Sequence, residues 1–257
     1  RMSGKFGDRL MYIGGQFVPG HGGQWIESVN PGTEEVHGRV PVGTVEDVHK
    51  AVLAAEAAQP AWAETTIWER RDLLRELGAA MKARAPEIVP MEAADTGNTI
   101  GSLGRDVEVA ANYLDLFSGY GTELKGDSVP ASKDGIHFSI REPYGVVARI
   151  VPFNHPFLFA AAHLAAPLMA GNTVIVKTPE TSPLTGTLMG EICRDVLPPG
   201  VVNIVHGPGL PTGDALVRHP KIWRIGFTGS VHTGLAIQRS AAEVAVKHIS
   251  LELGGKN

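Results

Sequence analysis

The length, composition and charge of the chain exclude several classes of protein. Its 257 residues are 43% hydrophobic and 19% charged. A chain of this length can bury a sizeable core, in one large domain or two small ones. Its composition excludes a disordered chain, a collagen or a disulfide scaffold. The formal net charge of −4 argues against a nucleic-acid-binding protein. A single cysteine, Cys193, rules out an internal disulfide and indicates a reducing compartment.

Signals for targeting or for membrane insertion are not found in the sequence. The start, 1–5, lacks the apolar core of a signal peptide. The most apolar stretch, 157–170, is interrupted by His163 and Pro167 and is shorter than a membrane-spanning helix. We therefore expect a soluble, cytoplasmic protein that does not associate with membranes.

The first 120 residues are predicted to be mainly helical. They begin with apolar residues around a Gly-Gly turn at 11–18, which is typical of a hairpin. Four helices are expected to follow: one capped by Thr44, one over 67–83, one from Pro86 to near Gly97, and one over 107–117. Between 121 and 142 the pattern indicates a two-stranded arm. Because an isolated hairpin is marginally stable, this arm needs a surface to pack on, and a partner subunit is one candidate.

From residue 145 onward, strands and helices alternate with short links. Strands are expected at 145–151, 173–177, 201–205, 223–227 and 244–251. Helices are expected at 157–170, 183–196, 211–217 and 230–242. Such repeated units build a Rossmann-type, doubly wound parallel sheet of the α/β class, whose ligands bind beyond the carboxyl ends of the strands. The loops after the strands are therefore the expected functional site.

The loop after the first of these strands holds an asparagine between two prolines, at 152–156. The amide of Asn154 is suited to donate hydrogen bonds to negative charge that develops on a carbonyl oxygen. An asparagine here can equally cap the following helix, and the residues alone leave both interpretations open. His155 has no partner at metal-ligand spacing, so we interpret it as structural and expect no metal site.

Three further strand ends carry residues suited to a nucleotide or to proton transfer. Glu180, close to Lys177, could accept hydrogen bonds from ribose hydroxyls and would repel a 2′-phosphate, although an exposed ion pair is the more frequent reason for such a pattern. Gly229 and Ser230 open a helix whose N–H groups suit a pyrophosphate. Glu252, beside two glycines, is either a general base or part of a strand-end turn.

Two classes of enzyme are excluded by what the sequence lacks. A short-chain dehydrogenase needs a tyrosine followed four residues later by a lysine, and none of the four tyrosines has one. A thiol enzyme that uses Cys193 is also unsupported, because this residue lies in the middle of a predicted helix among apolar residues. We therefore interpret Cys193 as a core residue.

Four of these motifs together resemble the aldehyde dehydrogenase superfamily. Residues 152–156 look like its Pro-Trp-Asn-Phe-Pro motif, and 177–180 look like its Lys-Pro-x-Glu with the proline displaced by one. Residues 227–230 match its Phe-Thr-Gly-Ser phosphate loop, and 251–256 contain its Glu-Leu-Gly-Gly-Lys signature. The resemblance runs from about residue 15 to 257, and four motifs in this order are jointly very specific.

The resemblance implies an oxidation of an aldehyde to a carboxylic acid by NAD+, with NADP+ as the alternative cofactor. Asn154 would be the side-chain half of the oxyanion hole, and Glu252 would be the general base. In the family a cysteine thiolate attacks the aldehyde to give a thiohemiacetal, and a hydride leaves for the cofactor. Water activated by the glutamate then hydrolyses the thioester.

The resemblance also implies a cofactor site. Its residues would be Val151, Pro152, Phe153, Lys177, Glu180, Gly209, Phe227, Gly229 and Ser230. Lys177 and Glu180 would hold the adenosine ribose, and Gly209 would lie under the adenine. Ser230 and the helix that it opens would hold the pyrophosphate.

The resemblance finally divides the chain and predicts its partners. Residues 1–120 and 143–250 would form the NAD(P)-binding domain, 121–142 the oligomerisation arm, and 251–257 the start of the catalytic domain. Since the family's nucleophilic cysteine lies well beyond the last motif, we expect a fragment of a longer enzyme, inactive alone. The whole enzyme would act on a small aldehyde as a homodimer or homotetramer. A catalytically silent nucleotide-binding or scaffold module is the alternative.

Overall fold

The structure, a computed structural model that describes residues 5–255, is built around one large sheet. In spatial order, its strands in this range are β11 (His248–Glu252), β10 (Ile222–Thr228), β7 (Val146–Ile150), β8 (Thr173–Lys177), β9 (Val202–Val205), β1 (Met11–Ile13) and β2 (Gln16–Val18). The five strands from β7 to β11 are parallel, and the antiparallel hairpin β1–β2 extends the sheet beyond β9. The predicted doubly wound α/β fold is confirmed.

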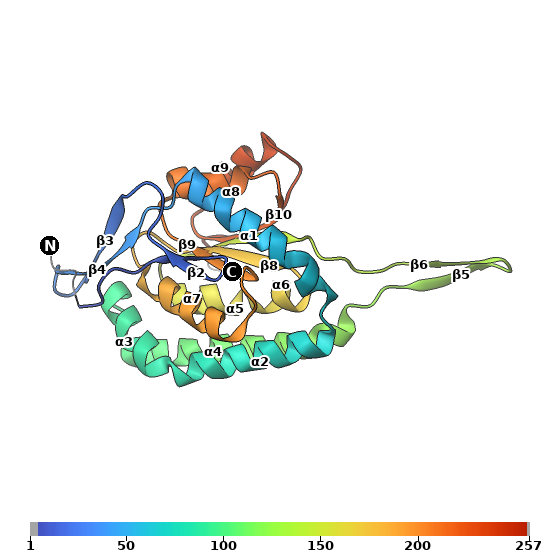
Figure 1. Cartoon of the computed structure of the whole chain (residues 1–257), viewed down its shortest axis with the longest axis horizontal. Coiled ribbons are helices and arrows are strands. Elements are labelled where there is room, and N and C mark those ends of the chain that lie inside the picture. The colour runs from blue at the N-terminus through green and yellow to red at the C-terminus, as the bar shows by residue number, and fades with distance from the viewer. Residues whose placement is uncertain (1–4, 256–257) are drawn as a thin grey trace.

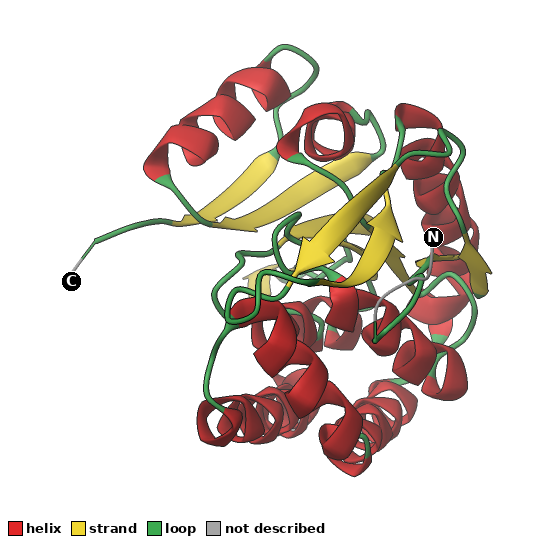
Figure 2. Ribbon diagram, turned by 90° about the vertical axis from the view of Figure 1, so that its left-hand side faces the viewer, coloured by secondary structure: helices red, strands yellow, loops and turns green. Residues whose placement is uncertain are grey.

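Helices cover the sheet on both sides (Figures 1 and 2). On one side lie α1 (Val45–Glu64), α8 (Asp214–Arg218) and α9 (Val231–Ala242). On the other side lie α5 (Pro156–Ala162), α6 (Ala165–Met169) and α7 (Leu184–Val196). Beyond these is a further layer with α2 (Ile67–Ala83), α3 (Ala85–Thr96) and α4 (Ile100–Gly119). The central strand β8 is buried along its whole length, as a strand covered on both faces requires.

The core is divided by the sheet into two apolar clusters. Successive residues of β7 alternate between them: Val147 packs in the cluster with α4 to α7, and Ala148 packs in the cluster with α1, α8 and α9. Cys193 of α7 is 1% exposed, and burial raises the pKa of its thiol to about 12. The interpretation of Cys193 as a core residue is therefore confirmed, and its thiol stays protonated at neutral pH.

Polar caps determine where several helices begin. The Thr44 hydroxyl accepts a hydrogen bond from the N–H of Asp47, and the Asp47 carboxylate accepts one from the N–H of Thr44. This capping box confirms Thr44 as the cap of α1. The helix expected at 107–117 begins earlier, at Ile100, because Thr99 caps it. Glycines in its first turns interrupt the apolar periodicity, which is why the sequence pattern does not show this start.

Among the predicted elements that differ from the structure are also a helix and a strand in the second half of the chain. The single helix expected at 157–170 is two helices, α5 and α6, because Pro167 has no N–H for the carbonyl of His163 and the chain turns there. The strand expected at 244–251 begins only at His248. The residues before it close the end of α9, where Val244 N–H donates to the carbonyl of Ala241 over 3.0 Å.

Two hairpins lie outside the main sheet. β3 (Trp25–Val29) and β4 (Val36–Pro41) pair antiparallel and were not predicted, although an Asn-Pro-Gly turn at 30–32 is a signal for them. The hairpin predicted within 121–142 is present as β5 (Ser128–Ser132) and β6 (Gly135–Phe138), and it projects far from the body of the molecule (Figure 1). None of the helices in residues 5–255 is both long and apolar enough to cross a membrane.

Candidate cofactor and catalytic site

The predicted site residues follow strands whose carboxyl ends lie at one edge of the sheet. The register places Ile150 of β7 opposite Lys177 of β8 and opposite Phe227 of β10. The next residue of β10, Thr228, pairs with Glu252 at the end of β11. The loops after these four strands therefore start at the same level, where a doubly wound fold binds its ligand.

The loop after β7 is fixed by side chains from other parts of the chain. The Ser182 hydroxyl donates to the Phe153 carbonyl oxygen over 3.0 Å. The Asn98 amide donates to the Asn154 carbonyl oxygen over 2.6 Å. Because both carbonyls are held from outside the loop, the backbone around Asn154 has a defined position.

Two carboxylates fix the end of the same loop. The Nδ1–H of His155 donates to Oδ2 of Asp106 over 2.6 Å, and the N–H of Phe157 donates to Oε1 of Glu92 over 2.9 Å. Glu92 is 1% exposed, and its Oε2 lies 2.6 Å from the Thr185 hydroxyl. Burial raises the pKa of Glu92 to about 8. Neither Asp106 nor Glu92 belongs to a sequence motif, and their partners are distant in the chain.

The side chain of Asn154 is free within this fixed loop. The N-cap position of α5 is His155, and no side chain caps the helix, so the interpretation of Asn154 as a helix cap is wrong. Among residues 5–255, no group forms a hydrogen bond with the Asn154 side-chain amide, and the residue is exposed. An amide with free N–H groups on a fixed backbone is able to stabilise negative charge on a carbonyl oxygen.

Lys177 and Glu180 lie together after β8, but their environments differ. Lys177 is 3% exposed, whereas the Glu180 side chain is half-exposed. The Lys177 ammonium donates to the Thr178 carbonyl oxygen over 2.9 Å and to Oε2 of Glu180 over 3.4 Å. Burial lowers the pKa of Lys177. The pair is therefore not the exposed ion pair considered from the sequence, because its cation is buried. The Lys177 ammonium has a third hydrogen, which remains free to donate to a ligand.

The loop after β10 leads into the first turn of α9. Ser230 is its N-cap, and the Ser230 hydroxyl accepts a hydrogen bond from the N–H of Thr233 over 3.1 Å. Gly229 donates its N–H to the carbonyl oxygen of Glu252 over 3.0 Å, which ties the loop to β11. A Cβ at Gly229 would lie 2.5 Å from the ring of Phe227, so this position needs glycine. The remaining N–H groups of the first turn can bind an anion.

The other predicted residues are placed as follows. Val151 and Phe227 are 5% and 7% exposed, so only their backbone can reach a ligand. Pro152 is half-buried and Phe153 is 66% exposed. Gly209 begins the short helical segment η2 (Gly209–Gly213) after β9 and is exposed, with open space around its Cα.

Glu252 ends β11 with its side chain exposed, and the described residues after it, 253–255, form no turn. Its position next to Thr228 brings it to the same edge as the loops described above. The Lys256 of the Glu-Leu-Gly-Gly-Lys signature and Asn257 lie outside the described residues.

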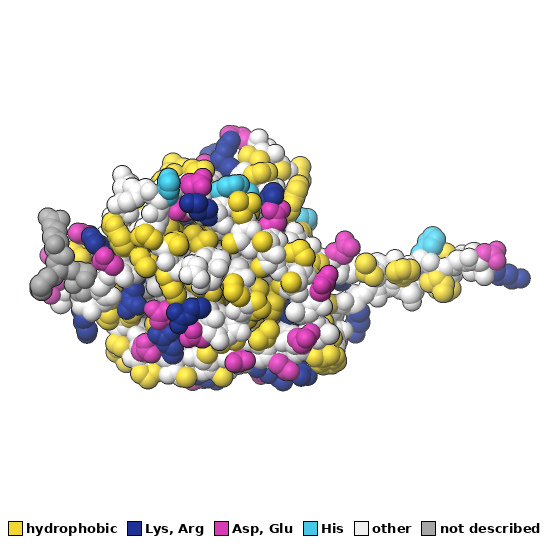
Figure 3. Space-filling view, in the orientation of Figure 1, with side chains coloured by type: hydrophobic (Ala, Val, Ile, Leu, Met, Phe, Trp, Pro, Cys, Tyr) yellow, Lys and Arg dark blue, Asp and Glu magenta, His cyan; other side chains and the backbone are white. Residues whose placement is uncertain are grey.

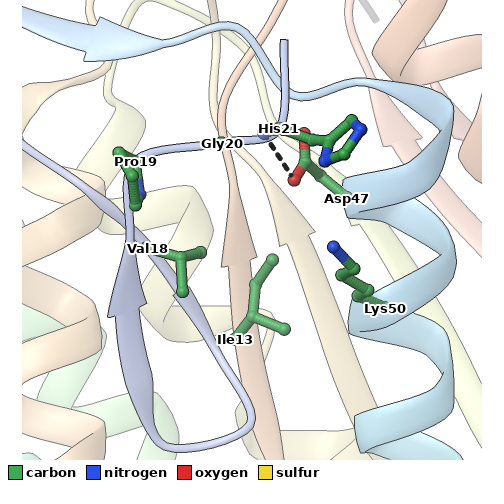
Figure 4. A pocket seen from close by; sticks show the side chains of 7 residues that line it. All are labelled: Ile13, Val18, Pro19, Gly20, His21, Asp47 and Lys50. Atoms are coloured by element: carbon green, nitrogen blue, oxygen red, sulfur yellow. Dashed lines mark hydrogen bonds between the residues drawn. The ribbon is translucent and has the colours of Figure 1, made fainter. Parts of the chain in front are cut away.

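Two cavities among the described residues lie away from the predicted site residues. One of about 230 Å³ lies between β2 and α1 (Figure 4), where the N–H of His21 donates to the carboxylate of Asp47. Another, of about 330 Å³, lies near the base of the β5–β6 arm and is lined by Arg141, Arg149 and Arg224. Neither of these two cavities is lined by a predicted site residue. Residues 5–255 contain no cluster of three or more His, Cys, Asp or Glu side chains suited to a metal ion.

Comparison with known proteins identifies relatives of about twice this length. The profile described as "Aldehyde dehydrogenase family" matches residues 17–257. Aldehyde dehydrogenase tropH of Talaromyces stipitatus is 43% identical over 234 residues, which cover 90% of this chain and 45% of that protein. Acetaldehyde dehydrogenase 2 of Cupriavidus necator is 36% identical over 247 residues, which cover 96% of this chain and 49% of that protein. The chain spans about half the length of these curated relatives.

Solved structures share the same fold. An aldehyde dehydrogenase of Bacillus cereus in complex with NAD+ has a TM-score of 0.93 and 36% identity, over 97% of this chain and 51% of that chain. Lactaldehyde dehydrogenase of Escherichia coli has a TM-score of 0.93 and 35% identity, over 97% of this chain and 53% of that chain. Since the family profile covers nearly the whole sequence and these structures superpose on nearly the whole fold, the chain belongs to the aldehyde dehydrogenase family.

Proposed function

We propose that this chain supplies the cofactor site and two catalytic groups of an enzyme that oxidises an aldehyde to a carboxylic acid with NAD+. One observation supports this most strongly: the residues Asn154, Lys177, Ser230 and Glu252 end or follow strands whose carboxyl ends lie at one edge of the sheet, in the order of the family's motifs. Family membership makes an aldehyde the expected substrate.

In this proposal the cofactor lies across the carboxyl ends of β7, β8 and β10. Lys177 and Glu180 hold the adenosine ribose, and Gly209 lies under the adenine. The first turn of α9, with Gly229 and Ser230, holds the pyrophosphate. The Glu180 carboxylate would repel a 2′-phosphate, so NAD+ is preferred over NADP+. The nicotinamide ring, when bound, supplies a hydride acceptor.

The catalytic groups act on the aldehyde carbon and its oxygen. Cys193 is buried and protonated, so the attacking thiolate comes from outside these residues. Asn154 donates to the oxyanion that forms when the thiolate adds to the carbonyl to give the thiohemiacetal. NAD+, when bound, would accept the hydride that this oxyanion loses as it becomes the thioester. Glu252 then takes a proton from water, whose hydroxide attacks the thioester carbon; the acid and the thiolate are released.

The proposed division of the chain follows from the same assignment. Residues 1–120 and 143–250 form the cofactor-binding domain, and 251–257 begin the catalytic domain. The segment 121–142 is an oligomerisation arm, and its exposed apolar side chains suit a contact with another subunit in a homodimer or homotetramer.

The proposed function is tested by turnover of the protein at the full length that its gene encodes. We expect formation of NADH that depends on an added aldehyde, faster with NAD+ than with NADP+. Because glutamine cannot take a proton from water, Glu252→Gln should lower kcat by about 100-fold or more. The measurement is steady-state absorbance of NADH.

Glu64→Gln, at the exposed end of α1, is the matched control and should leave kcat unchanged. Full turnover by the Glu252→Gln variant would contradict the role of Glu252. If the full-length protein binds NAD+ but oxidises no aldehyde, the proposal is wrong and the silent nucleotide-binding module replaces it.

A further inference from the structure

His155 departs from the motif that it belongs to, and the structure gives it a partner. The family's motif has phenylalanine after the asparagine, whereas this chain has a histidine. Its Nδ1 lies 2.6 Å from Oδ2 of Asp106, on α4, and the His155 and Asp106 side chains are 31% and 13% exposed. A phenylalanine could not form this contact, so the substitution creates a polar pair beside Asn154.

The Asp106 carboxylate determines which ring nitrogen of His155 carries the proton. An ionised carboxylate can only accept, so Nδ1 must donate its hydrogen to Asp106. In the neutral imidazole the other nitrogen, Nε2, then has a free lone pair. Among residues 5–255, no hydrogen bond involves Nε2, and the side chain is partly exposed. With the imidazole neutral, the pair presents a hydrogen-bond acceptor of fixed orientation to a ligand.

This acceptor lies close to the position proposed for the substrate carbonyl. Adjacent Cα atoms are about 3.8 Å apart, so the His155 ring starts one residue away from the Asn154 amide. The chain on both sides of His155 is held: the Asn154 carbonyl accepts from Asn98, and the Phe157 N–H donates to Glu92. We take the atoms next to the carbonyl of an aldehyde bound by Asn154 to lie beside this imidazole.

We propose that His155, oriented by Asp106, determines substrate specificity by accepting a hydrogen bond from a hydroxyl group near the carbonyl of the aldehyde. The inference rests on the proposed function, because it takes Asn154 as the group that binds the carbonyl oxygen. The substrate class is then hydroxylated aldehydes in preference to plain alkyl aldehydes. A site that is built to bind a hydroxyl discriminates against the analogue without one, since its own polar group is left unpaired.

The test compares pairs of aldehydes that differ by one hydroxyl, using the protein at the full length that its gene encodes. The pairs are 2-hydroxypropanal with propanal, and 3-hydroxybutanal with butanal. The measured quantity is the ratio of kcat/KM within each pair. We expect the unsubstituted protein to favour the hydroxylated member of at least one pair by about tenfold, equivalent to about 1.4 kcal/mol. In His155→Phe, which restores the family's residue, this ratio should fall to about 1.

Asp106→Asn tests separately whether Asp106 orients the imidazole of His155. The Asn amide can donate to Nδ1, which moves the imidazole proton to Nε2 and removes the acceptor, so the same ratio should fall. This variant also decides the question if His155→Phe does not fold, as judged by its circular dichroism. His21→Phe makes the same substitution at an exposed histidine of another part of the molecule and should keep the original ratio.

The outcomes separate the two proposals. A hydroxyl preference that survives in both His155→Phe and Asp106→Asn overturns the role of His155 and leaves the proposed function intact. The absence of any hydroxyl preference in the unsubstituted enzyme also overturns the role of His155. If the unsubstituted protein oxidises none of the four aldehydes, the proposed function itself is overturned, and the role of His155 with it.

Discussion

The loop around Asn154 shows which part of a site single residues of the sequence can indicate. Asn154 stands out because two prolines stiffen its loop at a strand end. The side chains that hold the loop, among them Asn98, Asp106 and Glu92, do not stand out at all. Each is brought there by the packing of α3 and α4 against α5, which no local pattern predicts. The sequence therefore indicates Asn154 as a candidate site residue, but it does not indicate the groups that fix its backbone.

Glu92 makes the stability of the protein depend on pH in a direction that can be measured. Burial raises the pKa of Glu92 from 4.5 to about 8, so the folded state keeps a proton that the unfolded state releases. The free energy of unfolding should then fall between about pH 4.5 and pH 8, by up to about 1.4 kcal/mol per pH unit from this group.

Glu92→Gln removes this titration and keeps the shape of the side chain. Its amide oxygen can still accept from the N–H of Phe157, and its amide N–H can donate to the Thr185 hydroxyl. Relative to the unsubstituted protein, the variant should gain on the order of 3 kcal/mol between pH 5 and pH 8 in urea unfolding. Glu76→Gln, at an exposed position of α2, serves as the control. A difference that does not change with pH would show that Glu92 is ionised in the folded state.

At the scale of elements, the sequence predicts helices and strands best where a cap or a buried run defines them. Thr44 marks the start of α1 through its capping box, and the apolar run of β8 marks a central strand. The prediction is wrong where a backbone property decides, as at Pro167 in α6, whose missing N–H leaves the carbonyl of His163 without a helical partner at the break between α5 and α6. It is also wrong at 244–247, because these residues complete the end of α9 before the chain becomes extended.

The start of α9 combines a structural role with the proposed binding of the pyrophosphate, and two substitutions separate them. Ser230→Ala removes the cap and should lower the free energy of unfolding by about 1 kcal/mol. Ser230→Asp keeps a capping side chain, so stability should be retained, but its charge repels an anion at the first turn. We expect NAD+ binding, measured by calorimetry, to weaken more than tenfold in Ser230→Asp.

Thr66→Ala provides the matched control for this pair of variants. Thr66 caps α2 with the same kind of hydrogen bond, from the N–H of Glu69, but α2 lies in the outer layer of helices. It should lose a similar amount of stability and bind NAD+ normally. Equal NAD+ affinity in Ser230→Asp and Ser230→Ala would remove the first turn of α9 from the cofactor site.

At the scale of the whole molecule, the projecting hairpin is hard to explain for a chain that works alone. Figure 3 shows hydrophobic side chains along the arm, and Ile136, Phe138 and Ile140 are 68–73% exposed. They occupy alternate positions, so their side chains share one face of β6 and its extension. An exposed apolar face of this kind is typical of a surface that another protein covers.

We therefore expect the arm to hold subunits together in the full-length protein. Phe138→Asp places a charge in the middle of the apolar face and should shift the sedimentation coefficient toward that of the monomer. The melting temperature of the isolated monomer should not depend on this residue, because Phe138 belongs to neither apolar cluster of the core.

His137→Asp puts the same charge on the opposite face of the strand, where His137 lies across from Val129. It should leave the oligomer intact, because an arm that contacts another subunit through one face is disrupted only by a charge on that face. Dissociation by both variants would mean that the hairpin is needed as a whole, without a dedicated face. An unchanged sedimentation coefficient in Phe138→Asp would show that subunits associate through another surface, and the arm would then have to be assigned a different partner.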